Sequence, residues 1–289
     1  MTDNSTTRKK KDQFVIAYVP TEEAGATVLP YAVRLSQVLN KGLILLHIDD
    51  RRYSRHRMDE GAMQALCDRW EGATAAVGKP CYCIVRQPTR KAIGGMATAL
   101  NAVVAVAAVD GKARRGHPTH PKEVLHNFVE CKVAYLTVQK GRSSEVRLGR
   151  VAFSVDFHKE SKEKLAWASY FARFAGSQLC AYYDQYSDSG LKAKWYNNMK
   201  FMTKFFNSLG ITYTPRPTTV GTALFPEVVL MRQAIDEGND VIISSATDPR
   251  AIDVVEFIVG TQERRIIVNS SRTPVLFLNP RDDIYVLCD

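Results

Sequence analysis

Three histidines close together in the chain are the first candidates for chemistry. His117 and His120 stand in a His-Pro-Thr-His run, and His126 follows six residues later. Imidazole nitrogens bind zinc, but a zinc site also needs further ligands, and no Cys or carboxylate stands at ligand spacing beside this group. Pro118 and Pro121 stiffen the run and make it loop-like. We therefore expect solvated loop histidines and no metal site.

The remaining reactive side chains also lack a catalytic arrangement. Cys81 and Cys83 alternate along a strand-like run, so both thiols point to one face, and their spacing differs from that of redox and zinc motifs. For His47, a hydrogen-bonded strand histidine is a simpler interpretation than a catalytic base. No Ser-His-Asp elbow, Walker loop or paired-carboxylate motif is apparent. We expect no catalytic residues, and hence a protein that is not an enzyme.

The charge is unevenly distributed along the 289 residues, which carry a net charge of +9. Residues 1–144 hold 22 Lys and Arg against 13 Asp and Glu, whereas residues 145–289 hold 17 of each kind. The excess lies in short clusters at 8–11, 51–57 and 112–115. Such clusters attract nucleic acid or acidic lipid when they share one face. Because no nucleic-acid module or aromatic–basic interleaving accompanies them, we interpret them as a solubilising surface.

Alternating strands and helices must position these residues. In the second half, strand-like apolar runs at 150–155, 179–183, 211–213, 241–244 and 274–278 alternate with helical patterns at 161–176, 195–210, 227–237 and 251–268. Strands separated by helices of this length imply right-handed crossovers and a parallel sheet covered on both faces.

The first half repeats this plan. Strands are expected at 14–19, 43–48, 81–85, 103–109 and 133–138, with helices at 26–40, 58–74, 93–101 and 122–130. The step from Pro20 to Asp49 is 29 residues, and that from Asp156 to Asp184 is 28. An internal duplication is the most direct explanation. A polar stretch at 140–145 joins the copies, so we expect domains at 13–140 and 149–280 and a C-terminal tail at 281–289.

The order and spacing of these elements resemble the universal stress protein family. Four segments carry the resemblance: Val155–Asp156, Leu45-Leu46-His47-Ile48, Gly260–Thr261 and Pro274-Val275-Leu276-Phe277. The whole chain is similar to a tandem member with two fused domains. The resemblance implies two Rossmann-like α/β domains, each a five-stranded parallel sheet of order 3-2-1-4-5 with helices on both faces. The resemblance also implies that a pseudo-two-fold axis relates the two domains, so that they pack as the two chains do in the dimer of single-domain relatives.

The resemblance also implies where a ligand binds, namely the crevice at the carboxyl ends of strands 1 and 4. ATP-binding members use an Asp after strand 1 for the nucleoside and a Gly-x2-Gly-x9-Gly-Ser/Thr pattern for the phosphates. Glycines let backbone N–H groups approach phosphates, and the following helix offers its positive end. The corresponding candidate nucleotide-binding residues are Asp156, Phe157, Tyr183, Thr247, Arg250, Gly260 and Thr261.

The second half departs from that pattern. Thr247 and Arg250 stand at the two earlier glycine positions, Pro249 has no N–H, and Asp248 would repel a phosphate. Arg250 offers positive charge as a side chain instead of a backbone cradle. A partial site remains, for which ATP or another adenine nucleotide is the candidate ligand. Asp156 has a second interpretation as a helix cap or turn acceptor.

The first half has lost more of the pattern. Pro20 stands where Asp156 stands in the second half, so the nucleoside-binding carboxylate is missing. The segment from Gly111 to Gly116 follows the fourth strand, but no Gly-Ser/Thr pair follows it at a suitable distance. We interpret this segment as a turn.

Two further segments suggest contacts between elements or chains. One helix carries aromatic residues on more than one face: Trp195, Tyr196, Phe201, Phe205 and Phe206. They indicate either thick packing within the domain or a surface for the sister copy or a second chain. In the tail, residues 284–287 have strand character and could extend a sheet edge.

These observations lead to one main expectation. We expect a cytoplasmic universal-stress-like protein with a role in stress response, binding or signalling and with degenerate adenine-nucleotide sites. No apolar run approaches a membrane span, and the six cysteines are expected to be reduced, mostly buried thiols. The expected partner is the sister domain in an intramolecular pseudo-dimer; a homodimer stays open, and neither nucleic acid nor membrane is expected. The alternatives are a structural adaptor that binds no nucleotide and a slow nucleotide hydrolase.

Overall fold

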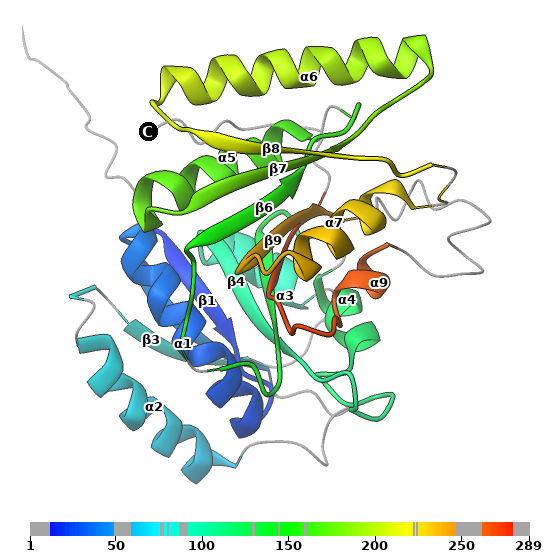
Figure 1. Cartoon of the computed structure of the whole chain (residues 1–289). Helices are drawn as coiled ribbons and strands as arrows, with labels where there is room; N and C mark the ends of the chain where they lie inside the picture. Colours follow the sequence, from blue (N-terminus) through cyan, green and yellow to red (C-terminus); the bar gives the residue numbers. More distant parts are fainter. Residues whose placement is uncertain are drawn as a thin grey trace, which may run out of the picture.

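Strands and helices alternate in both halves of the computed structural model (Figure 1). It describes residues 12–48, 59–75, 78–79, 81–86, 92–128, 131–143, 145–158, 161–221, 223, 225–246 and 262–279. The strands of the first half are β1 (Phe14–Tyr18), β2 (Gly42–Ile48), β3 (Cys81–Arg86), β4 (Ala102–Val109) and β5 (Ala134–Gln139). Those of the second half are β6 (Arg150–Ser154), β7 (Gln178–Asp184), β8 (Tyr213–Thr218), β9 (Val241–Ser245) and β10 (Val275–Leu278).

All ten strands form one sheet, in the order β3-β2-β1-β4-β5-β10-β9-β6-β7-β8. Each half contributes five parallel strands in the expected order 3-2-1-4-5. The two halves meet where β5 and β10 pair antiparallel, with Leu136 opposite Leu276. The strand order is therefore the same from either edge, as a pseudo-two-fold axis at this pair requires. The continuity of the sheet across the two halves was not predicted from the sequence.

Helices cover both faces of the sheet, as expected. They are α1 (Glu22–Leu39), α2 (Glu60–Ala75), α3 (Ala92–Ala99), α4 (Pro121–Phe128), α5 (Ser161–Tyr170), the π-helical turn η2 (Phe171–Ala175), α6 (Ser189–Ser208), α7 (Pro226–Asp236) and α9 (Glu263–Ile266). Buried side chains of α1, α5 and α6 belong to one core, and those of α3, α4, α7 and α9 to the other. No helix in these described stretches is long and apolar enough to cross a membrane.

The central strand β1 supplies both cores. Val15 and Ala17 lie in the core beneath α1, whereas Ile16 and Tyr18 lie in the opposite core. Successive strand residues point to opposite faces, so a strand buried on both faces is apolar throughout. This explains why the short continuous apolar runs of the sequence predicted the strands well.

Equivalent backbone contacts recur in the two halves. The Val19 N–H donates to the Leu46 carbonyl at 2.9 Å, and the Val155 N–H donates to the Tyr182 carbonyl at 2.8 Å. The first helix of each half ends on a left-handed residue, Asn40 at φ 53° and Gly176 at φ 71°. The offset is 136 residues in both cases, from 19 to 155 and from 40 to 176. This constant offset places Pro20 and Asp156 at equivalent positions, as expected.

Several expectations about element boundaries were wrong. The first helix begins at Glu22 instead of residue 26, because the Thr21 hydroxyl oxygen caps it by accepting from the Ala24 N–H at 3.1 Å. The strand expected to start within residues 211–213 starts at Tyr213, the last of them, and runs to Thr218. The last helix ends at Ile266, not at residue 268, and most of its expected length lies outside the described residues.

Two side-chain expectations have opposite outcomes. His47 is a satisfied strand histidine, as expected, since it is 3% exposed and its Nδ1 lies 2.7 Å from the Val19 carbonyl oxygen. Cys131 and Cys180 are buried, but Cys67 is disulfide-bonded, so the expectation of reduced thiols is wrong for that residue. The C-terminal residues 284–287, expected to extend a sheet edge, lie outside the described part.

Candidate functional site

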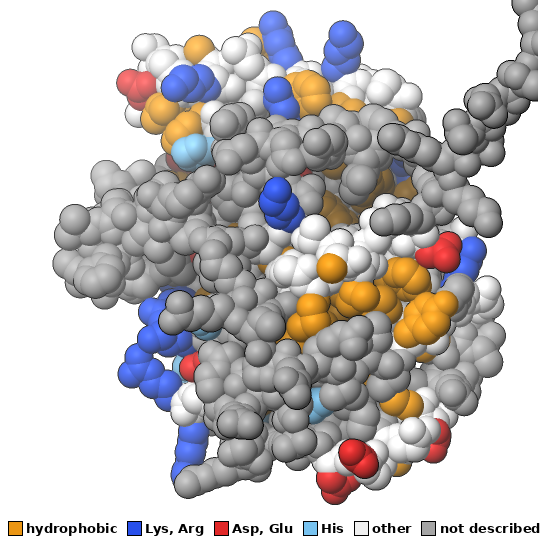
Figure 2. Space-filling view, turned by 180° about the vertical axis from the view of Figure 1, so that it is seen from behind, with side chains coloured by type: hydrophobic (Ala, Val, Ile, Leu, Met, Phe, Trp, Pro, Cys, Tyr) orange, Lys and Arg blue, Asp and Glu red, His pale blue; other side chains and the backbone are white. Residues whose placement is uncertain are grey.

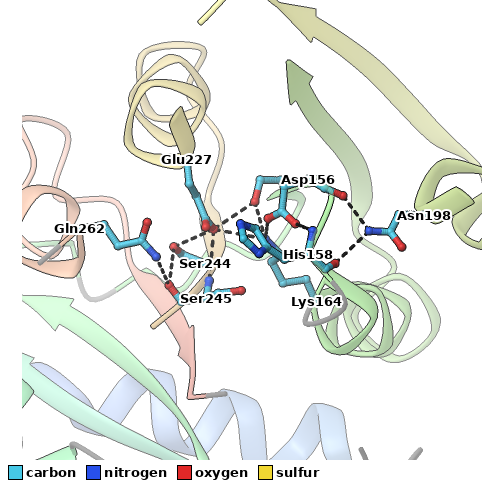
Figure 3. Close-up of polar contacts among 9 residues, drawn as sticks. Asp156, His158, Lys164, Asn198, Glu227, Ser244, Ser245 and Gln262 are labelled. Atoms are coloured by element: carbon cyan, nitrogen blue, oxygen red, sulfur yellow. Dashed lines mark hydrogen bonds and ion pairs between the residues drawn. The ribbon is translucent and has the colours of Figure 1, made fainter. Parts of the chain in front are cut away.

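A cluster of polar side chains lies at the carboxyl ends of β6 and β9, the edge where the family resemblance places a ligand (Figure 3). Ser154 ends β6 and Asp156 follows it. Ser244 lies near the end of β9. Lys164 and Glu227 come from the first turns of α5 and α7. Parallel strands direct their carboxyl ends, and the helix N-termini that follow, to one edge of the sheet.

Lys164 occupies the centre of this cluster. Its side chain is 0% exposed, and its Nζ donates to Ser154 Oγ at 2.6 Å, Asp156 Oδ2 at 2.9 Å and Glu227 Oε1 at 3.3 Å. An ammonium has three donors, and three oxygens surround this one. The Lys164 charge is thus neutralised inside the protein.

Glu227 is the acceptor that joins the two strands. Its Oε1 also accepts from the hydroxyls of Ser154 and Ser244, each at 3.0 Å, and from the Ser245 N–H at 3.2 Å. The Gln262 amide donates to the carbonyl of Ser245 at 3.1 Å. Figure 3 shows the carboxylates of Glu227 and Asp156 directed toward each other above Lys164. The carboxylate of Glu227 ties α7 to the ends of β6 and β9.

Asp156 has the second role that the sequence suggested, that of a turn acceptor. Its Oδ1 accepts from the His158 N–H at 2.8 Å, and its Oδ2 pairs with Lys164. The Asn198 amide of α6 donates to the carbonyls of Asp156 at 2.8 Å and of His158 at 2.9 Å, which fixes this turn. Both carboxylate oxygens of Asp156 therefore have protein partners.

Carboxylates outnumber cations among the described ionised groups at this edge of the sheet. Burial by itself lowers the pKa of Lys164, but the charges of Asp156 and Glu227 outweigh burial and hold that pKa above its usual value. Burial raises the pKa of Tyr186, and the charges of Asp156, Asp184 and Glu227 raise it further. Three carboxylates against one ammonium give these described groups a net charge of −2.

Aromatic rings connect the candidate residues that the structure describes. Phe157 lies 5.4 Å from Tyr186 in edge-to-face contact, Tyr186 lies 6.4 Å from Trp195, and Trp195 lies 5.4 Å from Tyr183. Phe157, which follows Asp156, is thus linked to Tyr183 through Tyr186 and Trp195. The other candidates, Thr247, Arg250, Gly260 and Thr261, lie outside the described residues.

Lys164, Glu227 and their two serines were missed in the sequence. The 136-residue offset places Val28 and Tyr18 where the second half has Lys164 and Ser154. The register of β4 beside β1 and of β9 beside β6 places Ala107 where the second half has Ser244, an offset of 137 residues. All three first-half residues are at most 3% exposed. Lys164 is charged, whereas the equivalent residue in the first half is the buried Val28. This difference between the two halves is the signal that could have identified the cluster.

The first-half counterpart of the crevice contains an exposed ion pair. Lys140 Nζ lies 2.6 Å from Glu23 and 3.4 Å from Asp110. Gly111 is required by a close approach, because an added Cβ would lie 2.8 Å from Cγ1 of Val268. The segment after β4 is a turn, as expected, held by the Lys112 N–H donating to Asp110 Oδ1 at 2.8 Å.

The histidines of the His-Pro-Thr-His run have local partners. His117 Nδ1 lies 2.8 Å from the Thr119 hydroxyl, and His120 Nδ1 accepts from the Lys122 N–H at 3.2 Å. Across the part of the chain that the structure describes, no three His, Cys, Asp or Glu side chains are grouped to hold a metal ion. His117 and His120 are loop histidines, as expected, whereas His126 lies in helix α4, so that expectation is wrong for His126.

Of the three basic clusters, only that at 112–115 is described, and its Lys112, Arg114 and Arg115 are exposed. Figure 2 shows Lys and Arg side chains mainly around the edge of one face of the molecule, with hydrophobic side chains gathered nearer its centre beside residues outside the description. The described basic side chains on this face are spread out instead of forming one stripe.

Comparisons with known proteins identify the fold. No protein-family model matches the sequence. No curated protein matches it either. A universal stress protein from Archaeoglobus fulgidus DSM 4304 has a similar structure, with a TM-score of 0.64 and 15% identity over 93% of this chain and 97% of its own. A candidate universal stress protein from Pseudomonas aeruginosa UCBPP-PA14 has a TM-score of 0.59 and 10% identity over 93% of both chains.

The same search finds the cytoplasmic domain of a prokaryotic cation chloride cotransporter, with a TM-score of 0.52 and 9% identity over 92% of this chain and 95% of that one. At these identities the likeness establishes the fold alone. The chain has the Rossmann-like α/β fold of universal stress proteins over almost its whole length, which confirms the fold expected from the sequence.

Proposed function

We propose that this chain acts as a tandem universal stress protein, with a role in stress response, binding or signalling and without enzymatic activity. The domains at 13–140 and 149–280 form an intramolecular pseudo-dimer in this proposal. Two observations support the pseudo-dimer: the strand order is the same when read from either edge of the sheet, and β5 pairs antiparallel with β10. The likeness to universal stress protein structures over 93% of the chain is consistent with it.

The adenine-nucleotide sites are degenerate in this proposal, and the buried Lys164 is the observation that carries it. The carboxylate that would bind a nucleoside, on Asp156, already has Lys164 and the His158 amide as partners. A nucleoside that binds this carboxylate must compete with both partners, so nucleotide binding is weak in this proposal. In the first half, Pro20 offers no carboxylate at all.

Nucleotide titration with thermal unfolding tests this proposal. A ligand stabilises the folded state by RT ln(1 + [L]/Kd). At about 5 mM nucleotide, a weak site with a Kd of about 1 mM stabilises by only about 1 kcal/mol, whereas a tight site with a Kd of about 1 μM gives about 5 kcal/mol. We expect the smaller effect for ATP, ADP and AMP. Stabilisation of the larger size would contradict degenerate sites.

Arg250→Ala tests the part of the site that follows β9. We expect this variant to weaken any nucleotide binding, because Arg250 stands where the family's glycine cradle is lost. Isothermal titration calorimetry of wild type and variant measures the change. Equal binding by both proteins would remove Arg250 from the proposed site.

A structural adaptor is the second candidate function, and the saturated crevice favours it. Lys164 donates to Ser154 Oγ and Ser244 donates to Glu227 Oε1, so these groups have partners without a ligand. An adaptor gives no thermal shift with any of the three nucleotides, whereas the leading proposal gives a small one.

A further inference from the structure

Three arginines line one cleft at the joint between the two halves. The cleft has a volume of about 400 Å³ and is formed by the linker after β5 and the loop before β10. Its lining residues are Gly141, Arg142, Ser143, Glu145, Arg147, Ser270, Ser271 and Arg272. It is separate from the crevice at β6 and β9, and it shares none of the residues of that polar cluster.

Two of the arginines hold the two loops together reciprocally. Arg142 of the linker donates from Nη1 to the Ser271 carbonyl at 2.9 Å. Arg272 donates from Nη1 to the Gly141 carbonyl at 2.6 Å. Arg272 also has a left-handed backbone, with φ 52°, which is unusual for a residue with a side chain. The two guanidinium groups are thereby fixed at the cleft by contacts that bring no negative charge.

The third arginine is balanced by the single carboxylate of the cleft. Arg147 Nη2 lies 2.8 Å from Glu145 Oε2, and both side chains are about two-thirds exposed, at 65% and 67%. Three guanidinium groups against one carboxylate leave the lining with a net charge of +2. A guanidinium has five N–H donors, and each contact to a carbonyl engages one of them. Donors therefore remain for a ligand.

We propose that this cleft binds a small, multiply charged oxyanion of the phosphate type, either free or as a phosphomonoester. Arginine is suited to this ligand because its planar fork can donate two parallel hydrogen bonds to two oxygens of one anion. The serine hydroxyls of the lining supply further neutral donors. A bound anion contacts both the linker and the loop before β10, so it bridges these two segments.

Calorimetric titration of the full-length protein at constant ionic strength tests the proposal, with inorganic pyrophosphate and O-phosphoserine as probes. We expect saturable binding of at least one probe, and the tighter one identifies the free or the monoester form. Arg147→Gln is the informative variant, because Arg147 has no bond to the other loop in its described contacts and its loss leaves the Arg142 and Arg272 contacts in place. It should weaken binding about tenfold.

A second variant moves affinity in the opposite direction. Glu145→Gln removes the repelling carboxylate and releases Arg147, so it should tighten binding at least threefold. Arg173→Gln is the matched control, because Arg173 is an exposed arginine of η2 that does not line the cleft and its removal changes the net charge equally. Its affinity should stay within twofold of wild type.

Three results would overturn the proposal: no saturable binding of either probe at millimolar concentration, an equal loss in Arg173→Gln and Arg147→Gln, or weaker binding in Glu145→Gln. The outcome is also separable from that for the proposed nucleotide sites. Arg147→Gln weakens phosphate binding at the cleft and leaves the nucleotide site unchanged, whereas Arg250→Ala acts on the proposed nucleotide site alone.

Discussion

Lys164 illustrates how much one residue changes a site within a duplicated fold. The equivalent position in the first half is Val28, which is buried in the core beneath β1. In the second half the same position carries an ammonium that neutralises Asp156 and Glu227. Removing one partner of a buried ion pair costs more than the pair contributes, because the remaining charges stay desolvated.

We predict that Lys164→Met lowers the free energy of unfolding by about 3–5 kcal/mol, since it leaves two carboxylates without their cation. Urea unfolding measures the change. Lys192→Met is the control, because Lys192 is exposed on α6 and its loss should change stability by no more than about 0.5 kcal/mol. Equal unfolding midpoints for Lys164→Met and wild type would show that the ion cluster is not important for stability.

The stabilising contribution of Lys164 should also depend on pH in the alkaline range. The pKa of folded Lys164 lies above its usual value of 10.5, since Asp156 and Glu227 outweigh the lowering effect of burial. Its stabilising contribution is therefore complete below the unfolded pKa and is lost as the pH rises through the higher folded pKa. The difference in unfolding free energy between wild type and Lys164→Met should shrink with rising pH above about 10.5. A difference that stays constant or grows would contradict this assignment.

At the scale of elements, the first helix of each half ends in the same backbone conformation but with a different residue. Asn40 ends α1 and Gly176 ends η2, and both have the left-handed backbone that a helix C-terminus uses. Glycine adopts this conformation without strain, and asparagine tolerates it better than other residues with a side chain. An added Cβ at Gly176 would meet no atom within 4 Å, so conformation alone decides the effect of substitution there.

We predict that Gly176→Ala costs about 1 kcal/mol of unfolding free energy and that Gly176→Asn costs less, as Asn40 indicates. Thermal unfolding compares the two variants. Gly95→Ala serves as a control inside helix α3, where space is open and φ is not positive, and it should stabilise by about 0.5–1 kcal/mol. A larger loss for Gly176→Asn than for Gly176→Ala would refute the conformational explanation.

An element of this fold could be predicted from the sequence where its apolar pattern matches its burial in the folded protein. The runs around Val15 and Val151 are apolar because both faces of these strands are buried, so the order of strands followed from the sequence. The start of α1 was not found, because Thr21 caps the helix one turn before its apolar stripe becomes clear. The ion cluster was not found either, because Lys164 and Glu227 are distant in sequence and only the folded crossovers bring them together.

At the scale of the whole molecule, the two halves are joined at the β5–β10 pair by buried side chains like those of a hydrophobic core. Tyr135 and Phe277 face each other across it with ring centroids 5.3 Å apart, and Phe128 stacks on Tyr135 at 4.8 Å. The Thr137 hydroxyl donates to the Val275 carbonyl at 3.1 Å. Buried aromatic contacts and a continuous hydrogen-bond ladder should make the two halves unfold together instead of separately.

Phe206→Ala tests whether the two halves unfold cooperatively, because it destabilises the second half at a site away from the β5–β10 pair. Phe206 is 0% exposed on α6, far along the sheet order from the joint, and its truncation should cost about 3–5 kcal/mol. If the sheet is one cooperative unit, hydrogen exchange of the most protected amides in β1 and in β6 should accelerate by the same factor, about 100-fold or more. Phe201→Ala on the same helix is the control, because Phe201 is 42% exposed and its loss should leave both strands nearly unchanged. Acceleration in β6 with unchanged exchange in β1 would mean that the joint holds together two halves that unfold independently.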